Sequence, residues 1–413
     1  MTCGATCPIP SVGGRTLSRR AYRTPGFGLR YAALLLVLAL PGCGSTPEQE
    51  PPAELSPFEP QARIARLWGD SVGDDEEFDL TNLRPFAHGE TVYAVDAGGA
   101  VTAYALKNGD RLWRHDLDRT ISSGVGGDGE RLWVTTRDGD LLALSAKNGK
   151  LLWSADVASE VITVPVVGQG KVIVRGVDGR VSVFDAVAGG ALWEYRSNVP
   201  VLSLRGVGEP LINGSVVFAG LDNGRVVALN LNDGTVIWEQ TISAPRGRSE
   251  VERLVDVDSA PVVDGDALYV GGYQGRIVLL AAGTGTTRWS RDMSTNKPLA
   301  LDRNSVFVAD EEGMVWALER NTGSALWKQD RLQRRRLTGT VVHAEYLAVG
   351  DFEGHVHWLS RTDGRLVARR QVHDTAISNA PLVYRDLLLV QSRGGYLAAL
   401  RILPLGEVEY PAN

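Results

Sequence analysis

Short apolar runs alternate with polar, glycine-containing turns along most of the chain. The stretch from Val216 to Trp238 shows this most clearly, with apolar and β-branched runs at Val216–Gly220, Arg225–Asn230 and Thr235–Trp238. Asp-Asn-Gly and Asn-Asp-Gly separate the runs, and such triplets accept the positive φ angles that tight hairpin turns need. The stretch therefore predicts three consecutive antiparallel strands.

The same three-strand pattern recurs along the chain, and nearly every copy ends in tryptophan. The terminal positions lie 38 to 51 residues apart and are Trp68, Trp113, Trp153, Trp193, Trp238, Trp289, Trp327 and Ala368. Repeats of this length that hold several strands are typical of β-propeller blades. The spacing therefore predicts an all-β fold, an eight-bladed β-propeller of four-stranded antiparallel blades.

The two ends of the repeat array complement each other. After Ala368 the chain supplies only the inner strands of one more blade, whereas the run Ile64–Trp68 precedes the first complete repeat. We expect this N-terminal strand to join the last blade and close the ring, because closure removes a free sheet edge. The recurring tryptophans are expected to pack between adjacent blades.

The N-terminus carries the features of an export signal. Residues 1–42 hold five arginines, no acidic residue and the apolar run Tyr31–Leu40, which is too short for a membrane-spanning helix. The run ends in Leu-Pro-Gly before Cys43, which is similar to a bacterial lipobox. We predict a lipoprotein signal peptide at 1–42 with lipidation of Cys43; the alternative is an ordinary secretory signal with an incidental cysteine.

Composition divides the rest of the chain. Residues 43–60 are rich in proline and glutamate and predict a flexible tether, followed by the propeller at 61–403 and a C-terminal tail at 404–413. The net charge is −6, and loss of the arginine-rich signal makes the mature chain more acidic. This charge argues against a nucleic-acid partner. Cys43 is the only cysteine outside the signal, so no disulfide is expected.

Candidate catalytic or metal-binding residues are few. His355 and His357 share one face of a predicted strand and could chelate a metal, but no third ligand is evident. The run Arg334–Arg336 could bind an anion, although a solvated loop or a local ion-pair partner fits an acidic chain better. Asp74–Glu77 is interpreted as a solvated turn. We predict no enzyme activity, no metal and no cofactor.

Two connections between blades differ from the repeat. The longest one, Ile242–Pro261, mixes arginines with acidic residues, and its neighbour, Val199–Gly208, alternates apolar residues with an arginine. Equivalent connections of consecutive blades share a rim, so we expect the two to be spatial neighbours. They form either a protein-binding patch or, for the apolar residues, part of a buried inner strand.

Three motifs carry a family resemblance: Leu202-Ser203-Leu204-Arg205-Gly206, the run Glu252–Asp258, and the run Gly350–Trp358. Together with the Gly-x-x-x-Trp ends of the repeats, they resemble the PQQ-type propeller repeat and, over nearly the whole predicted propeller, the BamB family of outer-membrane lipoproteins.

The resemblance implies a non-enzymatic scaffold on the periplasmic face of the outer membrane. It would act as a monomer within a hetero-complex, bind the POTRA domains of a BamA-like protein, and assist insertion of nascent barrel proteins. The partner-binding residues implied are Leu202, Leu204, Arg205, Arg253, Asp256 and Asp258. Two alternatives are a PQQ-dependent dehydrogenase, which needs cofactor-stacking aromatics and calcium ligands, and a glycan-binding propeller, which needs aromatics converging at a channel mouth.

Overall fold

The computed structural model describes residues 50–73, 83–197, 208–243 and 255–406. The chain divides into two compact units, Met1–Glu50 and Pro51–Asn413, and the described strands all belong to the second. The predicted signal peptide, Cys43 and the acidic run Asp74–Glu77 lie outside the described residues. No helix in the described ranges is long and apolar enough to cross a membrane.

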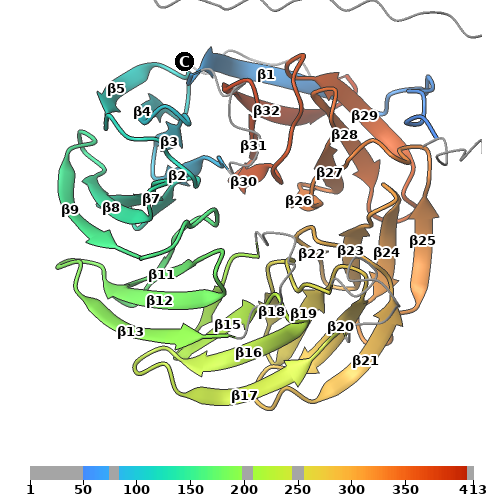
Figure 1. Ribbon diagram of the computed structural model, residues 1–413. Coiled ribbons are helices and arrows are strands. Elements are labelled where there is room, and N and C mark those ends of the chain that lie inside the picture. Colours follow the sequence, from blue (N-terminus) through green and yellow to red (C-terminus); the bar gives the residue numbers. More distant parts are fainter. Residues whose placement is uncertain (1–49, 74–82, 198–207, 244–254, 407–413) are drawn as a thin grey trace, which may run out of the picture. The chain divides into compact units, whose positions relative to one another are not determined.

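The described strands form eight four-stranded antiparallel sheets arranged as blades around a centre, as predicted (Figure 1). Blades 1 to 3 are β2 (Phe86–His88), β3 (Thr91–Val95), β4 (Ala100–Ala105) and β5 (Arg111–Asp116); β6 (Gly126–Gly127), β7 (Arg131–Thr135), β8 (Asp140–Ser145) and β9 (Leu151–Asp156); and β10 (Val166–Gly168), β11 (Lys171–Arg175), β12 (Arg180–Asp185) and β13 (Ala191–Arg196). Blades 4 and 5 are β14 (Leu211–Asn213), β15 (Val216–Gly220), β16 (Arg225–Asn230) and β17 (Val236–Thr241); and β18 (Val262–Asp264), β19 (Ala267–Gly271), β20 (Arg276–Ala281) and β21 (Thr287–Asp292).

Blades 6 and 7 complete the regular series. They are β22 (Ala300–Leu301), β23 (Ser305–Ala309), β24 (Val315–Glu319) and β25 (Ala325–Gln329); and β26 (Val341–His343), β27 (Tyr346–Gly350), β28 (His355–Ser360) and β29 (Leu366–Gln371). In each blade the short first strand lies at the inner edge of the sheet, and the middle strands are almost wholly buried because both faces pack on neighbouring blades.

Blade 8 closes the ring with both ends of the propeller. Its inner strands are β30 (Leu382–Tyr384), β31 (Leu387–Gln391) and β32 (Tyr396–Pro404), and its outer strand is β1 (Ala62–Ser71). Strand β1 runs antiparallel to β32, with Ile64 opposite Ile402, and it is longer at both ends than the predicted Ile64–Trp68. The predicted closure by the N-terminal strand is therefore confirmed.

The recurring tryptophans lock each blade to the next. Trp113 donates its Nε1–H to the carbonyl oxygen of Ala146 at 3.1 Å, and its ring lies against Gly149 in the same turn of blade 2. The same pair of contacts recurs at seven joints, from Trp68, Trp113, Trp153, Trp193, Trp238, Trp289 and Trp327 to Gly109, Gly149, Gly189, Gly234, Gly285, Gly323 and Gly364. The predicted packing role of these tryptophans is confirmed.

The described part of the predicted tether packs against the propeller. The amide of Ala53 donates to the carbonyl oxygen of Gln333 at 3.0 Å, and Arg331 Nη2 donates to Ser56 Oγ at 2.7 Å. Leu55 and Phe58 lie against the apolar core between blades 6 and 7. These contacts hold the segment from Pro51 onward against the propeller. The proline- and glutamate-rich composition gave no sign of the two apolar anchors.

Candidate functional site

The six predicted partner-binding residues divide into two groups. Leu202, Leu204, Arg205 and Arg253 lie outside the described residues, whereas Asp256 and Asp258 are described. Both aspartates are buried, with exposed fractions of 0% and 3%. Their carboxylates are therefore enclosed in the propeller, so they support a surface from within.

Asp258 belongs to a buried charge cluster that joins three blades. Arg175, at the end of β11 in blade 3, forms a close ion pair with Asp222 in the turn after β15 of blade 4. The other terminal nitrogen of Arg175 lies 3.9 Å from Asp258 Oδ1, just before β18 of blade 5. All three side chains are at most 3% exposed. One guanidinium thus serves two buried carboxylates, with Asp256 close by.

Burial of more carboxylates than arginines raises the pKa values of Asp258 and Asp222. Burial raises the pKa of Asp258 to about 7, against the lowering effect of Arg175 and with further raising by Asp256 and Asp222. Burial also raises the pKa of Asp222, although Arg175 opposes the shift. The charged form of a carboxylate loses hydration when it is buried, and a single arginine compensates only part of that loss. Asp258 therefore changes its charge near neutral pH.

The backbone around Asp258 contacts the described ends of both unusual connections. Gly208, at the end of the first connection, packs so closely on Asp258 that an added Cβ would lie 2.9 Å from its carbonyl oxygen. The backbone N–H of Val257 donates to the carbonyl oxygen of Leu221 of blade 4 at 3.2 Å, and the backbone N–H of Tyr273 of blade 5 donates to the carbonyl oxygen of Asp256 at 2.8 Å. The described ends of the connections are thus neighbours, as the sequence predicts for the whole stretches.

The inner ends of the blades leave a polar cavity of about 100 Å³ near Asp258. Arg84, just before β2, pairs with Glu209 in the wall of this cavity at 2.8 Å, and Lys297 and Asn379 add further polar groups to the wall. No aromatic residue lines this cavity. The aromatic platform that a glycan-binding channel mouth requires is therefore not present in its lining.

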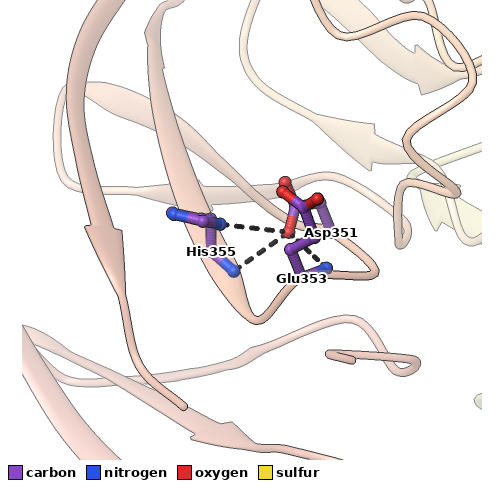
Figure 2. Close-up of side chains that lie close together, drawn as sticks. All are labelled: Asp351, Glu353 and His355. Atoms are coloured by element: carbon purple, nitrogen blue, oxygen red, sulfur yellow. Dashed lines mark hydrogen bonds and ion pairs between the residues drawn. The ribbon is translucent and has the colours of Figure 1, made fainter. Parts of the chain in front are cut away.

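A second charge cluster lies in blade 7, at the turn between β27 and β28. The carboxylate of Asp351 is fully buried and accepts hydrogen bonds from the amides of Glu353 and His355, both at 3.0 Å (Figure 2). Its Oδ2 accepts from Arg335 Nε and His357 Nε2, both at 2.8 Å. Burial alone would raise the pKa of Asp351, but its interactions with His355 and His357 hold it well below its usual range.

The hydrogen bonds also define the state of His357. Its Nε2–H donates to Asp351, and its Nδ1 accepts from Arg369 Nε at 3.2 Å, so the ring is the neutral Nε2–H tautomer. Burial lowers the pKa of His357, which keeps the ring uncharged at neutral pH. His357 therefore links two arginines through Asp351 and is a structural histidine.

The same turn holds one ligand set of metal-binding size among the described residues. Single ligand atoms of Asp351, Glu353 and His355 lie within 4.8 Å of one another. However, Arg335 is paired with both carboxylates and already supplies the positive charge that a metal ion would bring. The donor set thus fits the guanidinium of Arg335 rather than a divalent cation.

Sequence reasoning missed how these residues work together. Arg335 also donates to the carbonyl oxygen of Ala53 at 3.0 Å, so the Asp351 cluster anchors the N-terminal segment to blade 7. The run Arg334–Arg336 and the pair of histidines were visible signals, but the partner Asp351 and the distant Ala53 were not. Arg175 and Asp222 gave no signal, because each occupies an ordinary strand end or turn.

Solved structures of more distant proteins share this fold. The fold matches quinohemoprotein alcohol dehydrogenase from Comamonas testosteroni with a TM-score of 0.65 at 14% identity, covering 85% of this chain and 78% of that one. That identity shows a common fold alone. The closed eight-bladed β-propeller is therefore the class of this protein.

Closer relatives define the family. The sequence profile described as "Outer membrane protein assembly factor BamB" matches residues 97–329 and 317–403. The chain is 41% identical over 376 residues to BamB of Pseudomonas aeruginosa, covering 90% of this chain and 99% of that one, and 37% identical over 383 residues to BamB of Bordetella pertussis, covering 91% and 98%. The crystal structure of BamB from Moraxella catarrhalis matches with a TM-score of 0.76 at 29% identity, covering 82% of this chain and all of that one.

The chain belongs to the BamB family of outer membrane protein assembly factors. It is accordingly a non-enzymatic assembly factor, and family membership implies a place in the BAM complex.

Proposed function

We propose that this protein binds the periplasmic POTRA domains of a BamA-like protein through the connections that precede blades 4 and 5, and thereby assists insertion of barrel proteins into the outer membrane. Lipidation of Cys43 holds it at the periplasmic face of that membrane. Similarity to BamB proteins over about 90% of the chain supports this proposal most strongly.

The proposed residues have two different roles: some contact the partner, and the buried aspartates support the surface. Leu202, Leu204, Arg205 and Arg253 contact the partner, since apolar anchors beside a guanidinium suit a binding hot spot. Asp256 and Asp258 are enclosed, and they act by holding the roots of both connections in one place. A partner surface with acidic and apolar groups complements such a patch.

Binding of purified POTRA domains to the full-length protein in detergent tests the proposal. The triple variant Leu202→Ala, Leu204→Ala, Arg205→Ala should weaken binding about tenfold or more, because it removes two apolar anchors and one charge. The matched control is Lys150→Ala, Leu151→Ala, Leu152→Ala, which removes two exposed leucines at the start of the outer strand β9 and the cationic side chain just before it.

Circular dichroism and a thermal melt establish that both variants are folded. Loss of binding in the first variant and retention in the second support the proposed surface. Equal binding by both variants contradicts the assignment of the residues, and absence of binding by the unaltered protein contradicts the proposed partner.

A further inference from the structure

One of the eight joints between blades lacks the tryptophan that fills the other seven. At the joint from blade 7 to blade 8, Ala368 occupies the position of the tryptophan on the outer strand. Across from it in β28 stands Trp358, whereas the residue opposite the tryptophan in the neighbouring blade 6 is the small Ala317. In blade 7 the tryptophan is therefore on the third strand, β28, and the alanine is on the outer strand, β29, which reverses the arrangement of blade 6.

The indole of Trp358 lies nearer the centre of the ring and does not replace the missing contact between blades 7 and 8. Trp358 is fully buried and donates its Nε1–H to His343 Nδ1 at 3.1 Å, within its own blade. The seven regular tryptophans instead donate to a carbonyl group of the next blade. The outer part of the blade 7–8 joint therefore has no indole.

The receiving side of this joint is altered as well. Ala103 of β4 and Ala399 of β32 hold the same register position, each opposite a terminal tryptophan. The glycine that receives a tryptophan in blade 1, Gly109, lies six residues after Ala103, and Leu405 lies six residues after Ala399. Blade 8 has no hairpin turn at this point, because β32 stays paired with β1 up to Pro404, and the exposed Leu405 follows directly.

An open pocket of about 530 Å³ lies at this joint. Ala368 and Leu405 line it together with Phe58 and Ile64, and two arginines, Arg63 and Arg369, complete the wall. This volume lies within the range of ordinary ligand pockets, and the lining combines apolar surface with a few charged groups. The joint therefore presents a largely apolar hollow with two arginines in its lining, on an otherwise acidic protein.

One arginine of the pocket, Arg369, already contacts an aromatic ring. The guanidinium of Arg369 lies 5.2 Å from the ring centre of Phe58, in a cation–π arrangement. The N-terminal segment that carries Phe58 runs beside β29, where the amide of Gln61 donates to the carbonyl oxygen of Val367 at 2.8 Å. The surroundings thus suit an aromatic side chain delivered by an extended backbone.

We propose that this pocket at the blade 7–8 joint binds an aromatic side chain flanked by acidic residues in an extended segment of a partner protein. The aromatic ring fills the place that tryptophan fills at the other joints, and the acidic residues pair with Arg63 and Arg369. Strands β1 and β29, which supply part of the pocket lining, lie across the ring from β15 of blade 4 and β18 of blade 5, so this inference does not depend on the proposed POTRA binding (Figure 1).

Fluorescence anisotropy with a labelled peptide, acetyl-Glu-Gly-Trp-Gly-Glu-amide, on the full-length protein in detergent tests the proposal. Binding should be saturable, and replacing the peptide's tryptophan by alanine or its glutamates by lysines should weaken it about tenfold or more. Ala368→Trp should abolish binding by filling the pocket from within, and Arg63→Glu should weaken binding by reversing a charge at its edge.

Arg303→Glu, the same charge reversal on an exposed turn between β22 and β23, should leave binding unchanged. Because Ala368→Trp could disturb folding, Leu405→Asp offers a second test at an exposed position, and it should also weaken binding. Retention of binding in both Arg63→Glu and Leu405→Asp overturns the proposal, as does equal affinity for the alanine peptide.

The chain's own residues 407–413, which hold two glutamates and a tyrosine, are the competing occupant. A shortened protein that ends at Gly406 distinguishes binding of an external peptide from occupation by the chain's own tail. Binding of the peptide by the unshortened chain supports an external partner. Binding that arises only after the shortening overturns it in favour of the tail.

Discussion

Arg335 donates its Nε–H to Asp351 Oδ2 at 2.8 Å, and both side chains are almost completely buried. The arginine comes from the connection after blade 6 and the aspartate from the hairpin of blade 7. Since Arg335 also bonds to Ala53, this one pair joins the N-terminal segment, a blade connection and a hairpin turn. The pair should therefore contribute more to stability than an ion pair on the surface.

Asp351→Asn should lower the free energy of unfolding by roughly 2–4 kcal/mol, because it leaves Arg335 buried with less charge compensation. Chemical denaturation measures the change. Asp363→Asn is the matched control, since Asp363 pairs with Arg365 on an exposed turn and should change stability by less than about 1 kcal/mol. Similar losses in the two variants would contradict the structural role of Asp351.

The contact between tryptophan and glycine at each joint predicts that two glycines of one turn differ in their effect on stability. Gly285 has a φ of 71°, and a Cβ added there would lie 2.6 Å from the ring of Trp238, so Gly285→Ala should destabilise the protein by about 1–3 kcal/mol. At Gly283 the nearest atom to an added Cβ is 3.7 Å away. Gly283→Ala should therefore leave the melting temperature almost unchanged, and equal effects would exclude the joint as the cause.

The acidity of Asp258 predicts a pH effect on stability. Its pKa is about 7 in the folded chain and 3.8 as the ordinary value, so between these values the folded chain holds a proton that the unfolded chain releases. This contribution is complete below about pH 4 and is lost as the pH rises through 7, with a slope approaching 1.4 kcal/mol per pH unit.

Asp258→Asn removes this titration. The stability of the variant relative to the unaltered protein should therefore improve as the pH rises from 5 to 8, as measured by urea denaturation at each pH. Burial lowers the pKa of His357 and His343, which gives a contribution of the opposite sign below pH 6.5, but both histidines are present in the two proteins and cancel in the difference. A difference that does not vary with pH would contradict the assignment.

Membrane attachment should depend on one cysteine. Cys43→Ser should move the protein from the detergent phase to the aqueous phase in a Triton X-114 partition, because it removes the proposed lipid attachment site. Cys7→Ser, within the predicted signal peptide, should have no effect on the mature protein. Detergent partition of the Cys43→Ser protein would show that the anchor lies elsewhere.

The repeat pattern was enough to predict the propeller from the sequence. Turn triplets, strand periodicity and the spacing of the tryptophans are local features, and counting them led to eight blades and to closure by the strand around Ile64. The first two strands of the example repeat, Val216–Gly220 and Arg225–Asn230, have the predicted bounds.

Long-range pairs were not predictable in the same way. Arg335 meets Ala53 across 282 positions of the chain, and Arg175 meets Asp222 across 47, and no local pattern marks either pair. The burial of Asp256 and Asp258 also depends on tertiary contacts, so the sequence alone suggested surface residues. Ala368 was visible as an irregular repeat, but the pocket beside it was not.

Site-specific photo-crosslinking in cells tests the proposed binding of the POTRA domains. A photoreactive phenylalanine placed at Leu204, and in a separate strain at Leu152 on the outer strand β9, reports which surface meets the assembly partner. We expect a crosslink from position 204 to the POTRA domains of a BamA-like protein and none from position 152. A crosslink to those domains from position 152 alone would contradict it.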